Sequence, residues 1–225
     1  MYSLFLIRIT KMKSYEFILF DLDGTLTDPG VGITNSVSYA LSKFGISVAD
    51  KRELYSFIGP PLLDSFEKYY GFSEDDAKKA VSYYREYFRS DGMFENTVYD
   101  GVQETLEELK KRGKKLIVAT SKPEEFAEKI LEHFDLKKYF YGVAGASMDE
   151  KRNKKEDVIA YAIDRFDIVP EKAVMIGDRE YDVFGGRTFG MYTVGVLFGY
   201  GSKEELEAAG ADAIVSDFSE LLNIL

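Results

Sequence analysis

The segment FILFDLDGTLTD, residues 17–28, constrains the fold more than any other part of the chain. Four apolar residues, Phe17–Phe20, lead into Asp21 and Asp23, and Gly24 follows at once. A short apolar run bounded by a turn signal is typical of a buried strand. Two carboxylates at the end of such a strand are costly, because each loses water and repels the other. We therefore expect a cationic or phosphate-like group to compensate this charge.

Further short apolar runs rich in Val and Ile also have the character of buried parallel strands. The strongest are Leu116–Ala119, Val174–Ile176 and Tyr192–Val196, and the weaker ones are Val143–Ala146 and Ala213–Val215. Helical patterns separate these runs. The alternation predicts an α/β fold with a doubly wound, Rossmann-like parallel sheet and right-handed connections.

One interval interrupts this alternation. Between Ile33 and about Phe94 no strand-like run occurs, whereas apolar residues recur at helical spacing in three stretches. The stretches are Ile33, Val37, Ala40, Leu41 and Phe44; Leu62, Phe66, Tyr69 and Tyr70; and Ala77, Val81, Tyr84 and Phe88. We predict an all-helical cap domain at 28–95, inserted into a catalytic core formed by 1–27 and 96–225.

Composition limits the classes of function. The net charge of −10 over 225 residues argues against binding to nucleic-acid polymers or to anionic membranes, so an anionic substrate would need local cations. The absence of cysteine excludes disulfides and thiolate metal sites, and the single histidine leaves little room for a zinc site. The lack of cysteine is compatible with a reducing cytoplasm, and we expect a cytoplasmic monomer or homodimer. The phosphate-like group expected beside Asp21 and Asp23 suggests a small phosphorylated metabolite as its partner.

The N-terminal segment MYSLFLIRIT is apolar but is interrupted by Arg8, and no basic segment precedes it. It is too short to span a bilayer and lacks the small-residue cleavage site of a signal peptide. We interpret it as an extra edge strand or as an upstream extension, because Met12 would be a natural start before the first core strand.

Four places carry chemically informative residues: three of them are strand ends, and the fourth is a basic run that precedes a helix. In open α/β sheets, ligands bind outside the carboxyl ends of the strands, so these side chains are expected to meet. They form an acidic cluster with hydroxyls and lysines, which suits a magnesium ion and a phosphoryl group. The residues are Asp21 and Asp23, Thr120, Ser121 and Lys122, the basic run KRNKK at 151–155, and Asp178 with Asp182.

Each group has a physical role in such a site. Asp21 can attack phosphorus directly, and a Mg²⁺ ion held by Asp21, Asp178 and a backbone carbonyl would relieve the repulsion between the two anions. Asp23 faces the same way as Asp21 while the chain stays extended. With a raised pKa, Asp23 could protonate the leaving oxygen and later deprotonate water.

Three further elements would bind the phosphate. Gly24 permits a sharp turn that exposes backbone N–H groups to phosphate oxygens. Thr120 offers a hydroxyl beside a helix N-terminus, for which Pro123 is the expected first residue. Lys154 or Lys155 would supply a fixed positive charge.

Two other kinds of acidic site fit less well. An EF-hand calcium loop fails, because Leu26 lies where that loop needs Gly and Gly32 lies where it needs Glu. A phosphorylated receiver domain also combines an acidic pocket, a hydroxyl and a lysine on a doubly wound sheet. Its nucleophile, however, lies on a later strand, and no large helical insert follows its first strand.

Taken in order, the segments DLDGTLTD, LIVATSK, a downstream lysine and MIGDREYD resemble the four motifs of the haloacid dehalogenase superfamily. The resemblance covers essentially the chain after Met12. It implies Asp21 as nucleophile and Asp23 as general acid and base. It also implies a Mg²⁺ ion on Asp21, Asp178 and the Asp23 carbonyl, with Asp182 as a ligand or an outer support.

The resemblance further implies that Thr120 binds phosphate and that Lys155 neutralises it. Lys155 is preferred over Lys154 because of its offset to Val158 and Ile159, although the pattern allows either. An acid/base aspartate such as Asp23 is absent from dehalogenases and from phosphonate-cleaving members. The resemblance therefore implies hydrolysis of a phosphate ester.

Other segments resemble the branch that contains phosphoglycolate phosphatases and bacterial 5′-nucleotidases, and Arg179 leans toward the nucleotidases. Two alternatives stay open: a sugar-phosphate mutase of the β-phosphoglucomutase type, and a catalytically weak phosphate-binding regulatory protein. Substrate choice is expected from the IGPP loop, Ile58–Pro61, together with Lys122 and Arg179. The restricted residues Gly59 and Pro60 would reach over the phosphate when the cap closes, unless the loop is a plain turn.

Overall fold

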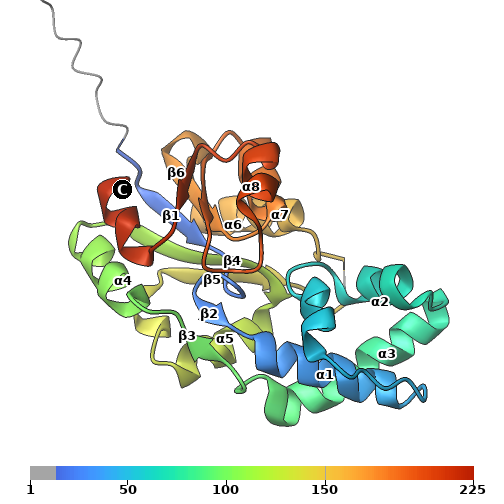
Figure 1. The fold of residues 1–225 in the computed structure, drawn as a ribbon. Helices are drawn as coiled ribbons and strands as arrows, with labels where there is room; N and C mark the ends of the chain where they lie inside the picture. The colour runs from blue at the N-terminus through green and yellow to red at the C-terminus, as the bar shows by residue number, and fades with distance from the viewer. Residues whose placement is uncertain (1–13, 150) are drawn as a thin grey trace, which may run out of the picture.

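A six-stranded parallel sheet dominates the computed structural model, which describes residues 14–149 and 151–225 (Figure 1). The strand order is β5–β4–β1–β6–β7–β8, so that β1 lies at the centre of the sheet. The predicted doubly wound parallel sheet is confirmed. The predicted edge strand or extension at 1–10 lies outside the described residues. The strands are β1 (Phe17–Phe20), β4 (Lys115–Pro123), β5 (Gly142–Ala146), β6 (Ala173–Gly177), β7 (Tyr192–Val196) and β8 (Ala213–Val215).

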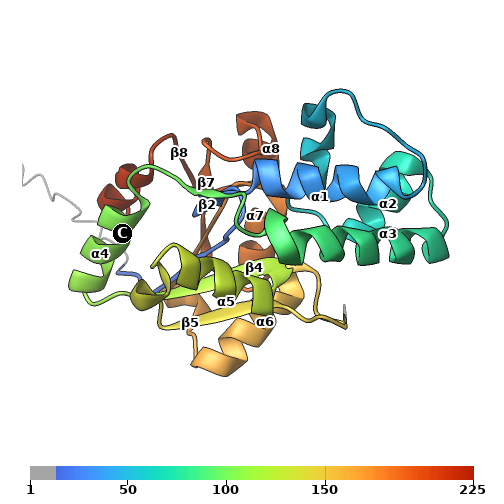
Figure 2. The same cartoon turned by 90° about the horizontal axis from the view of Figure 1, so that it is seen from below.

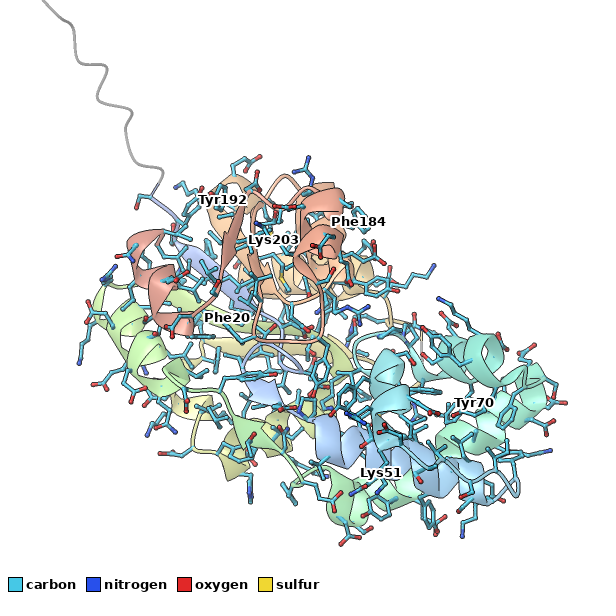
Figure 3. All side chains as sticks on the ribbon, in the orientation of Figure 1. Phe20, Lys51, Tyr70, Phe184, Tyr192 and Lys203 are labelled. Atoms are coloured by element: carbon cyan, nitrogen blue, oxygen red, sulfur yellow. The ribbon has the colours of Figure 1, made fainter. Side chains whose placement is uncertain are left out.

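Helices cover both faces of this sheet, because successive strand residues point to opposite sides. Ile18 and Phe20 of β1 join the core beneath α4 and α5, whereas Phe17 and Leu19 join the core beneath α6. Phe20 is fully buried and stacks on Phe218 with ring centroids 5.9 Å apart (Figure 3). The flanking helices are α4 (Val102–Lys111), α5 (Glu124–His133), α6 (Lys155–Phe166), α7 (Glu180–Thr188), α8 (Lys203–Ala209) and the 3₁₀ helix η5 (Phe218–Asn223).

The segment between β1 and β4 contributes a separate group of helices beyond the carboxyl ends of the strands (Figures 1 and 2). Their apolar faces form one continuous core, as the three periodic stretches predict. The short helix η1 escapes the prediction, because its two buried residues, Leu54 and Phe57, are too few to set a period. The elements are α1 (Gly30–Ser42), η1 (Lys51–Phe57), α2 (Leu62–Tyr70), α3 (Glu74–Tyr87) and the π-helical turn η2 (Phe88–Gly92).

Two short strands join this helical insert to the sheet. β2 (Thr27–Asp28) pairs antiparallel with β3 (Thr97–Val98), so the outgoing and returning chain segments are hydrogen-bonded to each other. The Asn96 amide adds a bond to the Thr27 hydroxyl at 3.2 Å. Strands of two residues carry no readable pattern, so this pair is not predicted. The division into a cap domain at 28–95 and a core stays a prediction.

No helix within residues 14–149 and 151–225 has both the length and the apolar character needed to cross a membrane.

The first helix of the insert approaches η2 very closely. A Cβ atom on Gly32 would lie 1.9 Å from the carbonyl oxygen of Gly92, which is far inside van der Waals contact. The Gly32 N–H also donates to the Glu95 carbonyl at 3.0 Å. Glycine at position 32 is therefore required for the packing of α1 on the chain that returns to the sheet.

We expect Gly32→Ala to lower the free energy of unfolding by about 2 kcal/mol, because the methyl group forces the two segments apart. Urea denaturation followed by circular dichroism measures this. Val31→Ala in the same helix is the control, since Val31 is 63% exposed and its truncation should cost about 0.5 kcal/mol or less. Equal losses in both variants would contradict the role of the close approach.

Candidate active site

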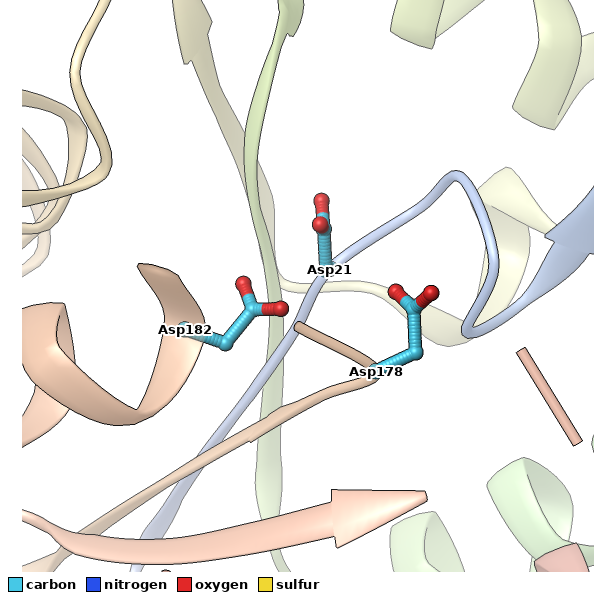
Figure 4. Close-up of side chains that lie close together, drawn as sticks. All are labelled: Asp21, Asp178 and Asp182. Carbon is cyan, nitrogen blue, oxygen red and sulfur yellow. The ribbon is translucent and has the colours of Figure 1, made fainter. Parts of the chain in front are cut away.

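Three buried carboxylates meet at the carboxyl end of the sheet (Figure 4). Asp21 directly follows β1 and Asp178 directly follows β6, and these two strands are neighbours. The Asp21 N–H donates to the Ile176 carbonyl at 2.9 Å, which continues the strand pairing up to the site. Asp182 lies one helical turn further on, in α7. Oxygen atoms of Asp21, Asp178 and Asp182 all lie within 4.8 Å of one another.

Lys155 at the start of α6 pairs with two of these carboxylates. Its Nζ lies 2.9 Å from Oδ2 of Asp21 and 2.7 Å from Oδ1 of Asp182. Burial lowers the pKa of Lys155, but the attraction of Asp182 and then of Asp21 outweighs this, so the pKa lies above its usual value. Lys154 is exposed at the N-cap position of α6. Of the two lysines that the sequence leaves open, Lys155 is the one at the site.

Asp178 has no such counter-charge. Its carboxylate accepts bonds from the Thr25 hydroxyl at 3.3 Å and the Tyr200 N–H at 2.8 Å. No side-chain cation forms an ion pair with Asp178 in the described part of the chain. Burial, followed by repulsion from Asp182 and Asp21, raises the pKa of Asp178 to about 8.

Such uncompensated charge is what a bound cation would relieve. Carboxylate oxygens are the preferred ligands of hard divalent cations. The cluster formed by Asp21, Asp178 and Asp182 can therefore hold a divalent metal ion.

Asp23 points away from this cluster and toward the helical insert. Oδ2 of Asp23 lies 2.5 Å from Nζ of Lys122, and that ammonium group lies 4.6 Å from the ring centroid of Phe88 in η2. Oδ1 of Asp23 is buried and has no hydrogen-bond partner among the described residues. Burial raises the pKa of Asp23, although Lys122 opposes the rise. Asp23 thus presents one free carboxylate oxygen.

The sharp turn predicted at Gly24 is present, but the Gly24 N–H is not free, because it donates to the Thr27 carbonyl at 2.8 Å within the turn. The exposure of other backbone N–H groups to a phosphate stays a prediction. Glycine is required at this position for two reasons. Its φ of +80° favours glycine, and a Cβ there would lie 2.3 Å from Oδ2 of Asp178. The glycine makes room for the acidic cluster.

The hydroxyl-bearing strand end also differs slightly from the prediction. β4 continues to Pro123 and α5 begins at Glu124, so Pro123 is the N-cap residue and not the first helical residue. The Thr120 hydroxyl accepts the Lys122 N–H at 3.2 Å, which orients it within the site. Thr120 and Ser121 both line the cavity beside Asp21.

This cavity has a volume of about 100 Å³ and lies between the sheet and the helical insert. Asp21, Asp23 and Lys122 line it from the sheet, and the apolar side chains of Phe57 and Phe88 line it from the insert. The predicted loop residues Gly59 and Pro60 also line it, whereas Arg179 does not. The structure therefore brings most of the predicted residues around one small, partly apolar space.

Two contributions escape the sequence analysis. The segment Gly199–Gly201 after β7 lies directly on Asp178: a Cβ on Gly199 would lie 2.3 Å from Cβ of Asp178, and the Tyr200 N–H binds its carboxylate. The available signal is the position of this glycine-rich segment at the carboxyl end of a strand. Phe88, which contacts Lys122, is indistinguishable in the sequence from the other apolar residues of its helical stretch.

Comparison with known proteins identifies a family whose sequences resemble this one. Residues 18–196 match the haloacid dehalogenase-like hydrolase family. The chain belongs to this family. The resemblance drawn from the four motifs is thereby confirmed, and the chain is a haloacid dehalogenase-like hydrolase.

Similar proteins within this family carry different names. A 5′-nucleotidase of Pseudomonas aeruginosa is 46% identical over 211 residues, which cover 94% of this chain and 96% of the relative. The tyrosine-protein kinase PtkA of Mycobacterium tuberculosis is 37% identical over 202 residues, covering 90% of this chain and 69% of the relative. The crystal structure of a predicted phosphatase from Clostridium acetobutylicum has a TM-score of 0.91 and 52% identity, covering 93% of this chain and 97% of that one.

We expect Lys155→Met to destabilise the metal-free protein by about 3 kcal/mol, because it leaves Asp21 and Asp182 buried without their counter-ion. Urea denaturation in the presence of a chelator measures this. Lys154→Met is the matched control, since that side chain is exposed and should change stability by about 0.5 kcal/mol or less. A larger loss for Lys154→Met would reverse the assignment of the two lysines.

Proposed function

We propose that this chain is a magnesium-dependent phosphatase that hydrolyses small phosphate monoesters through an aspartyl-phosphate on Asp21. The proposal is carried by the surroundings of the Asp21 carboxylate. Asp21 lines the cavity, Nζ of Lys155 lies 2.9 Å from its Oδ2, and an oxygen of Asp178 lies within 4.8 Å of it. A nucleophile that attacks an anionic phosphate needs fixed positive charge close by, and this site supplies one ammonium group and a place for a metal ion.

Asp21 is oriented for attack by its own hydrogen bonds. The Leu22 N–H donates to Oδ1 at 2.7 Å, and Lys155 binds Oδ2 at 2.9 Å. These two contacts fix the orientation of the Asp21 carboxylate, which lines the cavity. In the first step an Asp21 oxygen bonds to phosphorus and the bond from phosphorus to the leaving oxygen breaks. Thr120 and Lys155 would bind the phosphoryl oxygens, because Thr120 lines the cavity together with Asp21 and Nζ of Lys155 lies 2.9 Å from the Asp21 carboxylate.

Asp21 and Asp178 would hold Mg²⁺, and Asp182 would support them, because Asp182 is already engaged by Lys155 and by the Arg179 N–H at 3.1 Å. When bound, the ion would supply positive charge that lowers the repulsion between the Asp21 carboxylate and an anionic phosphate. Asp178 is the member of the cluster without an ammonium partner, so a bound ion would stabilise its charged carboxylate more than those of Asp21 and Asp182. Magnesium suits the site because it takes few carboxylates and keeps several waters.

Asp23 would manage the proton. Its unpartnered Oδ1 is buried, and the raised pKa favours the protonated form that can donate to the leaving oxygen. After the alcohol has left, the resulting carboxylate can take a proton from the water that attacks the aspartyl-phosphate. The Lys122 ammonium group at 2.5 Å holds Asp23 in place through both steps.

Two observations bear on the leaving group. The cavity of about 100 Å³ favours a compact one, such as the glycolate of 2-phosphoglycolate. The 46% identity with a 5′-nucleotidase over nearly the whole chain favours a nucleoside instead. A nucleoside monophosphate remains the second candidate substrate, and its leaving group would need more room than this cavity offers.

We expect Mg²⁺-dependent release of phosphate from at least one compound in a panel of nucleoside monophosphates, 2-phosphoglycolate and sugar phosphates. Asp21→Asn should lower kcat by about 10³-fold or more, because the amide does not attack phosphorus. A chelator should abolish release from the unmodified protein, and Mg²⁺ should restore it. Conversion of a sugar phosphate into its isomer without phosphate release would instead support the mutase.

We expect Asp23→Asn to affect poor leaving groups more than good ones, since only the former need a proton in the first step. For 2-phosphoglycolate kcat should fall by about 10²-fold or more, whereas the burst of p-nitrophenol from p-nitrophenyl phosphate should be nearly retained. Rapid-mixing absorbance measurements follow this burst. An equal loss of the first step for both esters would contradict the role of Asp23 as general acid.

A further inference from the structure

Two cavities adjoin the loop Ile58–Pro61. On one side lies the cavity of about 100 Å³ that contains Asp21, and on the other lies a cavity of about 380 Å³ between α2, α6 and α7. Gly59, Pro60 and Pro61 line both cavities, and so do Ser121 and Asn153. Because the same loop residues form a wall of each space, the position of the loop determines how much room adjoins the nucleophile.

Arg179 holds this loop from the side of the sheet. Its Nη1 donates to the Ile58 carbonyl at 2.9 Å, and its Nε donates to Oε1 of Glu205 in α8 at 2.8 Å. The Arg179 and Glu205 side chains are only 18% and 22% exposed. Glu205 in turn accepts the Glu180 N–H at 2.9 Å, so the acceptor is itself fixed. The guanidinium group is therefore held on one side by the core and binds the insert on the other.

The loop rests on the side chain of Arg179 as well as on its hydrogen bond. A Cβ on Gly59 would lie 3.4 Å from both Cγ and Nη1 of Arg179. Gly59 has a φ of +105°, which L side chains rarely adopt, so replacing it would strain the backbone whatever the effect on substrates. The restraint is better tested at Arg179, whose backbone is ordinary.

The restraint is also tied to the acidic cluster. Arg179 follows Asp178 directly, and its N–H donates to Oδ2 of Asp182 at 3.1 Å. The backbone that carries the guanidinium group is thus fixed by the same residues that would hold the metal ion. The loop is positioned relative to the reacting atoms and not merely relative to the outer surface.

We propose that Arg179 is a specificity-determining positioning residue, which clamps the Ile58–Pro61 loop against the core, keeps the two cavities separate and so restricts the leaving group to a compact size. This inference rests on the proposed function. Release of the clamp joins the two spaces, and a bulky leaving group such as a nucleoside then gains access next to Asp21.

The test compares kcat/KM for adenosine 5′-monophosphate with kcat/KM for 2-phosphoglycolate. In Arg179→Met the ratio of the first to the second should rise about 3- to 10-fold, as expected for the loss of one hydrogen bond that restrains the loop. Arg179→Lys retains the charge but not both bonds, so its ratio should lie between those of the unmodified protein and Arg179→Met. An unchanged or lower ratio in Arg179→Met overturns the inference.

Arg187→Met is the matched control. Arg187 lies in α7, the helix whose N-cap residue is Arg179, and it also binds a backbone carbonyl, that of Gly210 at 2.7 Å, on the core. Its removal should leave the ratio unchanged. If Arg179→Met does not fold, Glu205→Gln is used in its place, because a neutral amide is a weaker acceptor for the Arg179 guanidinium group than a carboxylate. The ratio of kcat/KM for adenosine 5′-monophosphate to that for 2-phosphoglycolate must then rise in Glu205→Gln.

A second measurement does not depend on activity. The chain has no cysteine, so spin labels can be placed at Asp75→Cys in α3 and Gln103→Cys in α4, both of which are exposed. Electron–electron distance measurements should show that the distribution of distances between the two labels is broader or shifted in Arg179→Met. The same distribution should be unchanged in Arg187→Met. An unchanged distribution overturns the clamp. If the unmodified protein releases no phosphate from any substrate, the proposed function is contradicted. The distances between the labels then still test whether Arg179 restrains the loop.

Discussion

The Lys155 ammonium group, 2.9 Å from Asp21 and 2.7 Å from Asp182, joins the ends of β1, α6 and α7 in one buried ionic contact. Three carboxylates with a single ammonium group leave an excess of negative charge. Lys155 pairs with Asp21 and Asp182, so the carboxylate without an ammonium partner is that of Asp178. Buried charge of this kind persists only when the surrounding structure holds it in place. The parallel sheet does so, because neighbouring strands end at the same edge and deliver their last residues to one point.

The helical insert completes the site and does not merely cover it. Phe88 of η2 lies against Lys122, and Lys122 pairs with Asp23, so the environment of the Asp23 carboxylate is set partly by the insert. A second link runs from Tyr200, whose N–H binds Asp178 and whose hydroxyl binds Asp28 at the start of the insert. The position of the insert and the state of the carboxylates are therefore physically connected at two places.

Much of this arrangement can be predicted from the sequence. Buried parallel strands are apolar throughout, so β1, β7 and β8 are recognised with their observed bounds, and the residue after each strand end is then placed by the topology alone. The same reasoning finds Asp21 and Asp178 and narrows the lysine to two positions. These predictions share one cause: the signal is a short, continuous apolar run or the residue that directly follows it.

The remaining features depend on contacts between segments that are distant in the chain. Whether the Gly24 N–H is free depends on the Thr27 carbonyl, and whether Arg179 faces the substrate depends on Ile58, 121 residues away. A proline before a helix fits either the N-cap or the first turn, and only the strand that precedes Pro123 decides between them. The two-residue pair β2 and β3 has no period at all. Such features appear only when the whole chain is folded.

That pair of strands has a consequence for how such a protein can change over time. Because the chain leaves the sheet at Thr27–Asp28 and returns beside it at Thr97–Val98, the two ends of the helical insert are neighbours in space. Any other folded segment whose ends lie equally close can be joined at the same two points without altering the order of a single strand. The residues at the ends of the strands and the helical insert that covers them can therefore change independently. A different insert can replace this one while the acidic cluster stays the same.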